Sequence, residues 1–229
     1  MDPADAAGPV VLARRAEAHG EVVLRRRGQV IELIVDGGFA MDTVDTSTER
    51  ALATTALGAV SGEPLHVLVG GLGLGFTLAA VLTDPRVRRV GVIESSSAVV
   101  EWVTAGLVPA TAGVLGDPRV RVTLGDVRDV VPGLPPAGAD ALLLDVDNGP
   151  GFLLHPANAA VYGKRFLADA VRALRPGGVL AVWSAEPSDA LETALGAAAG
   201  EVTPAPHRVH RDGHTLEYTI YLARRIREG

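Results

Sequence analysis

Residues Leu65–Thr77 read LHVLVGGLGLGFT, and this stretch decides the fold. An apolar run of β-prone residues breaks into a glycine-dense turn, and an apolar helical pattern follows the turn. A second apolar run, Val90–Ile93, then ends at the carboxylate of Glu94. This order predicts a strand, a turn, a helix and a second strand with an acid at its tip, where the ribose hydroxyls of a nucleoside can be held.

The glycine spacing indicates which kind of nucleoside fits. The alternative interpretation of these glycines is a tight turn with no ligand. The dinucleotide fingerprint G-x-G-x-x-G/A requires a small residue where this chain has Phe76 or Leu78. The chain instead has a G-x-G-x-G pattern with one glycine before it, made by Gly70, Gly71, Gly73 and Gly75. This pattern resembles the first motif of the class I S-adenosylmethionine-dependent fold. The resemblance implies that these glycines, with Glu94, bind an S-adenosylmethionine-type nucleoside.

Length and composition fit one globular unit and exclude several classes of protein. The chain has 229 residues and a net charge of −6, which disfavours nucleic-acid and anionic-membrane partners and mildly favours a cationic substrate. It has no cysteine, so disulfides and thiolate metal sites are excluded and a reducing cytoplasm is the expected location. No apolar run is long enough for a membrane-spanning helix, and the N-terminus lacks a signal-peptide pattern.

The sequence predicts three segments. Residues 1–20 are expected to form a flexible leader, and residues 21–45 a small β-meander of two or three short strands with an Asp-Gly turn. Such a meander is too small to fold alone, so it should pack on the main domain or on a second subunit of a homodimer. Residues 46–229 are expected to form the nucleoside-binding α/β domain, which opens with a hydroxyl-capped helix that runs to about Val60.

From residue 65 onward, strand and helix patterns alternate, which is typical of a parallel sheet with helices on both faces. The predicted strands are 65–70, 89–94, 119–124, 139–145 and 178–184, followed by an antiparallel pair at 201–209 and 215–223. The predicted helices are 74–83, 97–106, 157–175 and 187–199. The expected fold is therefore α/β: a doubly wound, mostly parallel, seven-stranded Rossmann-like sheet of the class I methyltransferase type, with the meander at its N-terminal side.

Ligands of open parallel sheets bind beyond the carboxyl ends of the strands, so polar residues at strand tips are the candidate site. Asp126 follows the third strand, where a short acid can bind an adenine amino group or cap a short helix. Asp145 follows the apolar run Ala141–Leu144 at the mouth of a strand that should be buried, so its carboxylate must be solvated, paired or in use. Asp147 and Asn148 come next and either take part in the site or cap the turn.

Several motifs together resemble spermidine synthases, the polyamine aminopropyltransferases. They are the glycine loop, Gly125-Asp126, the acidic loop 145–150, the following helix with Tyr162, and the meander that ends in Ser47-Thr48-Glu49-Arg50. The resemblance implies that Glu94 holds the ribose, Asp126 holds the adenine and Asp145 takes a proton from the attacking amine. Asn148 stands where that family carries a second acid. Leu74 stands where it carries the loop acid that receives the aminopropyl ammonium, and the segment after Arg50 lacks the family's diamine-site tyrosine and histidine.

Three further groups of residues are weaker candidates. Tyr162 could orient an amine, although an aromatic residue there is more often a packing residue, and His155 either lines the pocket or is a loop residue. The histidines near the C-terminus have no compact metal-ligand spacing, so no metal is expected; they are His207, His210 and His214.

The predicted function is a transferase that binds S-adenosylmethionine or its decarboxylated form as co-substrate and alkylates a small-molecule amine. The catalytic candidates are Asp145, Asp147 and Tyr162, and the substrate-binding candidates are Asn148 and His155. In-line displacement at a carbon bonded to sulfonium requires mainly alignment and an unprotonated amine. A methyltransferase acting on a small molecule and a non-catalytic nucleoside-binding protein remain the alternatives.

Overall fold

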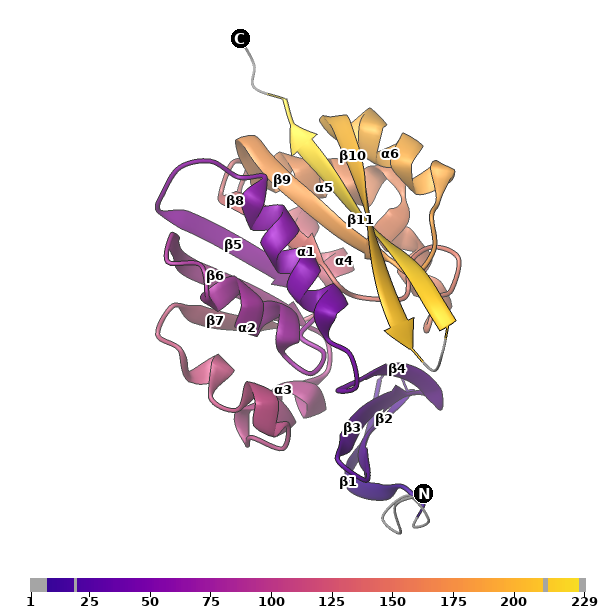
Figure 1. Ribbon diagram of the computed structural model, residues 1–229. Coiled ribbons are helices and arrows are strands. Elements are labelled where there is room, and N and C mark those ends of the chain that lie inside the picture. The colour runs from indigo at the N-terminus through magenta and orange to yellow at the C-terminus, as the bar shows by residue number, and fades with distance from the viewer. Residues whose placement is uncertain (1–7, 19, 212–213, 227–229) are drawn as a thin grey trace.

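A computed structural model of the chain describes residues 8–18, 20–211 and 214–226. It contains a seven-stranded sheet with the strand order β10-β11-β9-β8-β5-β6-β7 and a separate four-stranded antiparallel sheet with the order β1-β2-β3-β4 (Figure 1). In the large sheet, β5, β6, β7, β8 and β9 are parallel, and β11 and β10 form an antiparallel hairpin at one side, with β11 antiparallel to β9. This architecture confirms the expected fold class.

The strands of the large sheet form where the sequence has short apolar runs, because a parallel strand covered on both faces needs nearly continuous apolar residues. Every residue of β8 is buried, for example. The strands are β5 (Leu65–Gly70), β6 (Val87–Glu94), β7 (Val120–Leu124), β8 (Ala139–Leu144), β9 (Leu174–Ser184), β10 (Gly200–Arg211) and β11 (His214–Arg225). The carboxyl ends of β5 to β9 therefore lie at one edge of the sheet, where the candidate site residues follow them.

Helices cover both faces of the large sheet. One face packs against α1 (Ser47–Gly58), α2 (Phe76–Leu82) and α3 (Ser97–Thr104), and the other against α4 (Val127–Val130), α5 (Lys164–Ala173) and α6 (Asp189–Ala199). Short 3-10 helices connect them: Pro109–Thr111, Val114–Gly116, Val131–Gly133 and Pro156–Tyr162. The two apolar clusters thus lie on opposite faces of the sheet, as in other doubly wound folds.

The meander is larger than the sequence predicts. Its strands are β1 (Val10–Glu17), β2 (Gly20–Arg27), β3 (Val30–Val35) and β4 (Gly38–Asp42). The leader expected over residues 1–20 therefore contains a strand, because β1 pairs with β2 along its length. Residues 1–7 and 19 lie outside the described residues. The pattern of β1 was missed because its Val10, Val11 and Leu12 are exposed and show no clear buried alternation.

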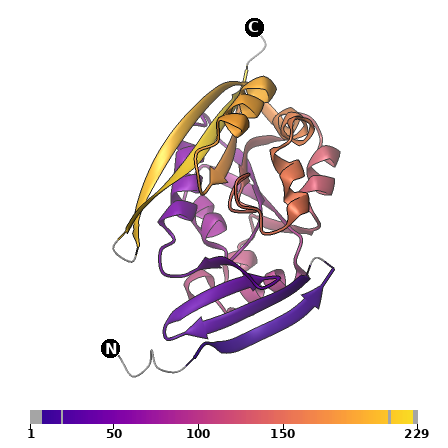
Figure 2. The same ribbon diagram turned by 90° about the vertical axis from the view of Figure 1, so that its right-hand side faces the viewer.

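Two contacts fix the meander against the main domain. The carboxylate of Glu17, at the end of β1, accepts hydrogen bonds from the Ser97 hydroxyl (2.8 Å) and the Ala98 N–H (2.9 Å) at the start of α3. Arg15 of β1 forms an ion pair with Glu101 of α3 at 2.7 Å. The meander consequently lies across the carboxyl end of the sheet, and the long β10–β11 hairpin extends toward it (Figures 1 and 2).

Two predicted boundaries are wrong. The helix expected over 157–175 is divided by Gly163 into the 3-10 helix Pro156–Tyr162 and α5, because Gly163 has an extended conformation with ψ 149°. The last strand of the parallel set starts at Leu174 rather than at 178, so the Pro-Gly-Gly segment belongs to β9 instead of preceding it. The remaining helices and strands begin or end within about two residues of their predicted ends.

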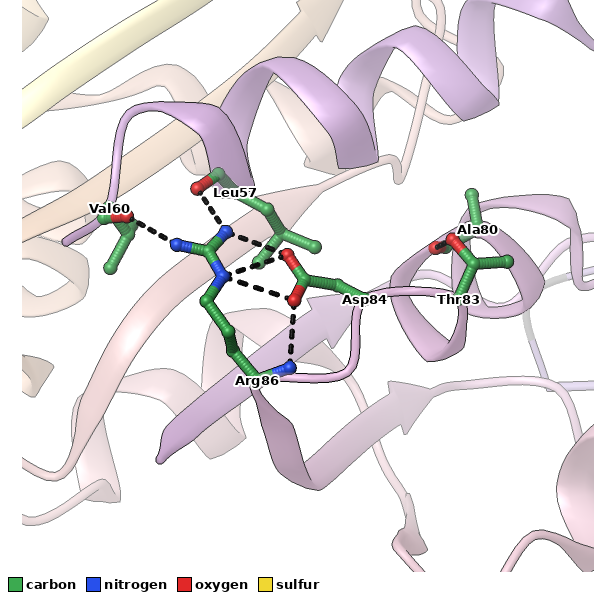
Figure 3. A network of polar contacts seen from close by, with 6 residues as sticks. All are labelled: Leu57, Val60, Ala80, Thr83, Asp84 and Arg86. Atoms are coloured by element: carbon green, nitrogen blue, oxygen red, sulfur yellow. Dashed lines mark hydrogen bonds and ion pairs between the residues drawn. The ribbon is translucent and has the colours of Figure 1, made fainter. Parts of the chain in front are cut away.

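Arg86 joins the end of α1 to the start of β6, at the edge of the sheet opposite to the candidate site residues (Figure 3). Its guanidinium donates to the carbonyls of Leu57 (2.9 Å) and Val60 (3.0 Å) and pairs with Asp84 at 2.7 Å. The Val60 carbonyl gains a side-chain donor in this way, and the Leu57 carbonyl, which already accepts from the Val60 N–H at 3.2 Å, gains a further one. This contact holds α1, and with it Glu49 near its start, against the sheet.

In the described part of the chain, no single helix is long and apolar enough to cross a membrane. One bent helix pair, Ser97–Thr104 with Pro109–Gly116, meets the length and composition criteria only when its two parts are taken together.

Candidate functional site

A cavity of about 1000 Å³ opens at the carboxyl ends of the parallel strands, beneath the meander. Its walls come from the meander, the start of α1, the glycine loop, the tips of β6, β7 and β8, and from Trp183 of β9 and Tyr218 of β11. Ligands of doubly wound sheets bind at this end of the strands. This cavity is therefore the candidate site.

The glycine loop allows two strand tips to approach each other closely. Gly71 has a φ of 89°, and a Cβ at this position would overlap the backbone oxygen of Asp145. Its N–H donates to the Ile93 carbonyl at 2.9 Å, and Gly75 caps α2 with a φ of 89°. Gly71 and Gly73 line the cavity. Gly71 is thus required by the close approach of the β5 and β8 tips, and the glycine turn lies between β5 and α2 as the sequence predicts.

Glu94 lies at the tip of β6 and joins that tip to the glycine loop. Its Oε2 accepts from the Leu72 N–H at 2.7 Å, and its Oε1 accepts from the Ser96 N–H at 2.8 Å. Burial raises the pKa of the Glu94 carboxyl, and these backbone donors act in the opposite direction. Each oxygen of a carboxylate can accept more than one hydrogen bond, so Glu94 can still receive ribose hydroxyls from the cavity side.

Asp126, at the tip of β7, is the N-cap of α4 and also a wall residue of the cavity. Its Oδ1 accepts from the Arg128 N–H at 2.8 Å, which is the capping bond. Its Oδ2 forms an ion pair with the Arg128 guanidinium at 2.6 Å, and both side chains line the cavity. The sequence did not indicate this pairing with Arg128. A nucleobase at this end of the cavity would meet a carboxylate that is already held in place.

Asp145, directly after β8, lines the cavity. Its Oδ2 accepts a hydrogen bond of 2.7 Å from the Thr77 hydroxyl in the first turn of α2. Burial raises the pKa of the Asp145 carboxyl, and the Thr77 bond lowers it again in part. No basic side chain of the described residues forms an ion pair with Asp145. A half-buried carboxylate with no cationic partner among the described residues can pair with an ammonium that enters the cavity.

The acidic loop after β8 is organised by Asp147. Its Oδ1 accepts from the N–H groups of Asn148 and Leu154, both at 2.8 Å, and its Oδ2 accepts from the Asn158 side chain at 2.7 Å. The Nδ1 of His155 accepts from the N–H two residues further on, so His155 caps the 3-10 helix that follows. All five of these residues line the cavity. Asp147 therefore holds the loop after β8 in shape and also lines the cavity.

Tyr162 and Leu74, like Gly70 and Gly75 of the glycine loop, do not line the cavity. Tyr162 packs against the apolar cluster on the α5 side, and burial together with the charges of Asp147 and Asp145 raises the pKa of its phenol. Leu74 is 1% exposed and belongs to the core on the α1 side. An acid at position 74 would therefore be buried in that core.

Sequence reasoning overlooked Glu49 as a site residue. Glu49 stands in the first turn of α1, and its sequence pattern indicates only a helix start, yet it lines the cavity. Its Oε2 accepts a hydrogen bond of 2.6 Å from the Thr48 hydroxyl. Burial and the nearby charge of Asp145 raise the pKa of Glu49 to about 7. Only the fold could reveal this proximity, because the two acids lie far apart in the sequence.

The ionisable side chains that line the cavity are mostly acidic. Among the described residues, eight acidic side chains line it: Glu17, Asp42, Asp45, Glu49, Glu94, Asp126, Asp145 and Asp147. Arg128 is the one lysine or arginine among the described lining residues, and it is paired with Asp126. In the described part of the chain, no three His, Asp or Glu side chains are grouped so as to hold a metal ion. The excess of acidic side chains makes the cavity complementary to cations.

The sheet order divides the cavity into two halves. β6 and β7, which carry Glu94 and Asp126, lie on one side of the β5–β8 pair, and β9 and β11 lie on the other. Asp145 stands at the boundary between the halves. The second half has an aromatic wall, because the rings of Trp183 and Tyr218 pack with their centroids 5.3 Å apart and both line the cavity. Two ligands can therefore meet at Asp145 from opposite sides.

Comparisons with known proteins agree with this geometry. No protein-family model matches the chain. The polyamine aminopropyltransferase of Mycobacterium tuberculosis (strain ATCC 25618 / H37Rv) is 34% identical over 179 residues, which cover 77% of this chain and 33% of that protein. Putrescine N-methyltransferase 1 of Nicotiana tabacum is 33% identical over 118 residues, which cover 52% of this chain and 30% of that protein. The chain thus spans about a third of the length of the curated relatives it matches.

A solved structure, that of spermidine synthase from Thermotoga maritima, superimposes with a TM-score of 0.78 at 15% sequence identity. The match covers 96% of this chain and 74% of that one. At this identity the likeness shows the fold, and it includes the meander as well as the large sheet. The 34% identity to the aminopropyltransferase and this shared fold together confirm the resemblance to spermidine synthases that the sequence motifs indicated.

Proposed function

We propose that this relative of the polyamine aminopropyltransferases is itself a transferase, which moves an aminopropyl group from decarboxylated S-adenosylmethionine to a small cationic amine. One observation carries the proposal most strongly: the half-buried carboxylate of Asp145 lies between a half-cavity with Glu94 and Asp126 and a half-cavity with an aromatic wall. The sequence similarity to an aminopropyltransferase over 77% of the chain supports it.

The charge of the cavity favours the decarboxylated nucleoside over the intact one. Intact S-adenosylmethionine carries a carboxylate, which costs free energy to bury unless a cation or hydrogen-bond donor pairs with it. Arg128, the one lining lysine or arginine among the described residues, is engaged by Asp126 at the adenine end. The decarboxylated tail carries an ammonium and suits the acidic wall.

The reaction needs little beyond alignment and removal of a proton. Asp145 accepts a proton from the acceptor's ammonium, and the free amine nitrogen then attacks the methylene carbon bonded to sulfur. The new carbon–nitrogen bond forms as the carbon–sulfur bond breaks, and the bonding pair leaves on sulfur to give a neutral thioether nucleoside. The protein contributes by holding nitrogen, carbon and sulfur in line.

Methyl transfer from intact S-adenosylmethionine is the second candidate. It is supported by Leu74, which is buried in the core at the position where spermidine synthases have an acid in the glycine loop. The similarity to a putrescine N-methyltransferase also supports it. That similarity covers 52% of the chain, against 77% for the aminopropyltransferase. Aminopropyl transfer is therefore the first proposal.

Product analysis tests the proposal. The protein is incubated with an aliphatic diamine and either nucleoside, and the products are identified by mass spectrometry. We expect an aminopropylated amine and methylthioadenosine from the decarboxylated nucleoside. A methylated amine from the intact nucleoside alone would establish the second candidate. Tight nucleoside binding without any product from either would favour a binding protein.

We also propose that the chain forms a homodimer through the meander. β1 is an edge strand of the small sheet, and its Val10 and Val11 are 51% and 48% exposed. An exposed edge strand with apolar side chains is a ready site for pairing with another chain. Symmetric dimers are the commonest oligomers of this kind.

A further inference from the structure

Glu49 is a titratable cavity residue for which the reaction above has no role. It lies in the first turn of α1 and accepts a hydrogen bond of 2.6 Å from the Thr48 hydroxyl. No lysine, arginine or histidine of the described residues forms an ion pair with it. A carboxylate that is partly removed from water next to other acids is unfavourable unless a cation arrives. The free protein therefore leaves Glu49 without a compensating charge.

The surroundings of Glu49 belong to the half of the cavity away from Glu94 and Asp126. The start of α1 contacts the C-terminal hairpin, since the Nε2 of His207 in β10 lies 3.2 Å from the Ser47 hydroxyl. The charges that act on Glu49 are those of Asp145 and Asp45, and both raise its pKa. Arg50, the next residue, is exposed. Glu49 thus interacts with the proposed base and not with the two acids of the nucleoside half.

We propose that Glu49 is the acceptor-binding carboxylate of this cavity, which holds an ammonium group of an aliphatic amine opposite Asp145 and thereby selects cationic acceptors. This inference rests on the proposed function and adds to it the residue that sets the acceptor class. The nucleoside occupies the side of Glu94 and Asp126, and the amine enters on the side of α1, β9 and β11. Glu49 binds the amine, and Asp145 takes the proton from the reacting nitrogen.

A cation bound between these two acids changes their protonation. With a pKa of about 7, Glu49 is protonated in about half of the free molecules at pH 7. A bound ammonium favours the carboxylate, so binding releases that proton, about half a proton per ligand at pH 7. At a pH of about 8.5 Glu49 is already ionised in most molecules, and the release should largely disappear.

Isothermal titration calorimetry measures this release without catalysis. The protein, saturated with 5′-methylthioadenosine, is titrated with 1,4-diaminobutane at pH 7 in two buffers of different ionisation enthalpy. Glu49→Gln keeps the size of the side chain and removes its charge. Glu192→Gln is the matched control, because Glu192 also stands in the first turn of a helix, α6, but outside the cavity.

For Glu49→Gln we expect binding weakened by about 10- to 100-fold, the loss typical of removing a charged hydrogen-bond partner, and little proton release. The Glu192→Gln control should match the wild type in both quantities. Equal affinity and equal proton release in wild type and Glu49→Gln would overturn the inference while leaving the proposed function intact. A wild-type protein that binds methylthioadenosine but no diamine would overturn the proposed acceptor class and this inference together.

Discussion

At the scale of single residues, the site depends on carboxylates held by specific donors. Glu94 is held by two backbone N–H groups, Asp126 by Arg128, Asp145 by Thr77 and Asp147 by loop donors. Each acid is thereby fixed in one orientation before a ligand arrives. Preorganised groups of this kind lower the cost of binding and alignment.

Glu94→Gln should weaken nucleoside binding and also lower stability by about 1–3 kcal/mol, because the glutamine NH2 group faces the N–H of either Leu72 or Ser96 and leaves it unpaired. Glutamine keeps one carbonyl oxygen as an acceptor but removes the charge and one acceptor site that the ribose hydroxyls would use. We expect decarboxylated S-adenosylmethionine and methylthioadenosine to raise the wild-type melting temperature, and the shift to be smaller for the variant. NAD serves as the negative control, since the glycine spacing does not fit a pyrophosphate. A shift with NAD alone would contradict this assignment.

Asp145→Asn should separate chemistry from binding. Asparagine can still accept from Thr77 but is no longer basic, so turnover should fall by roughly 10²–10⁴-fold while nucleoside affinity stays nearly constant. Steady-state kinetics together with nucleoside titration measure both quantities. Unchanged turnover would show that alignment alone carries the reaction.

Glu49→Gln should stabilise the free protein at pH 8 and have little effect at pH 5. The pKa of Glu49 is about 7 in the folded state against 4.5 for an ordinary glutamate, so the folded state binds more protons than the unfolded state between these values. Below about pH 4.5 Glu49 is protonated in both states and does not lower the free energy of unfolding. As the pH rises from 4.5 through about 7, ionisation of Glu49 lowers the free energy of unfolding. We expect a gain on the order of 1 kcal/mol at pH 8, about 2–4 °C in melting temperature. Equal shifts at pH 5 and pH 8 would contradict the assigned environment.

At the scale of elements, the fold brings separate segments to one edge of the sheet. The sequence predicted β5 to β8 and the residues after them, because apolar runs that end in glycine or acid are strong local signals. It did not predict β1, whose exposed valines show no buried alternation, nor the division of the 157–175 helix at Gly163. Glu49 was missed for a different reason. Its proximity to Asp145 depends on how α1 packs, and local sequence patterns carry no information about such packing.

Gly71→Ala tests the close approach of β5 and β8 at the glycine loop. The added methyl would overlap the backbone oxygen of Asp145, and the φ of 89° is unfavourable for alanine. We expect reduced stability and loss of nucleoside binding, measured by thermal unfolding and titration. Gly58→Ala is the matched control: Gly58 ends α1 with nothing within 4 Å of an added Cβ. It should be neutral or stabilising, by up to about 1 kcal/mol. Similar losses in both variants would refute the steric argument.

At the scale of the whole molecule, the meander and the main domain enclose one cavity between them. Glu17 and Arg15 attach β1 to α3, so residues 10–17 take part in closing the site. The exposed valines of β1 lie on the same strand. A homodimer formed through β1, as proposed, would couple assembly to the shape of the cavity.

Light scattering tests the proposed assembly. We expect the wild type to have the mass of a dimer at micromolar concentration, because β1 presents an apolar edge. Val11→Lys should shift the population toward monomer, since charged residues on an edge strand oppose pairing. Thr193→Lys is the control for added charge, because Thr193 is an exposed residue of α6, far from β1 in the fold. This variant should have the same mass in solution as the wild type. A monomeric wild type would remove the meander interface.

The most direct test of the central claim is a competition between the two nucleosides. The protein is given equal concentrations of decarboxylated and intact S-adenosylmethionine with 1,4-diaminobutane, and the alkylated diamines are quantified by mass spectrometry. Asp145→Asn is run in parallel as the control for enzymatic product. The account predicts that the aminopropylated diamine dominates and falls sharply in the variant. A product that is mainly methylated, or that is equally abundant with Asp145→Asn, would contradict it.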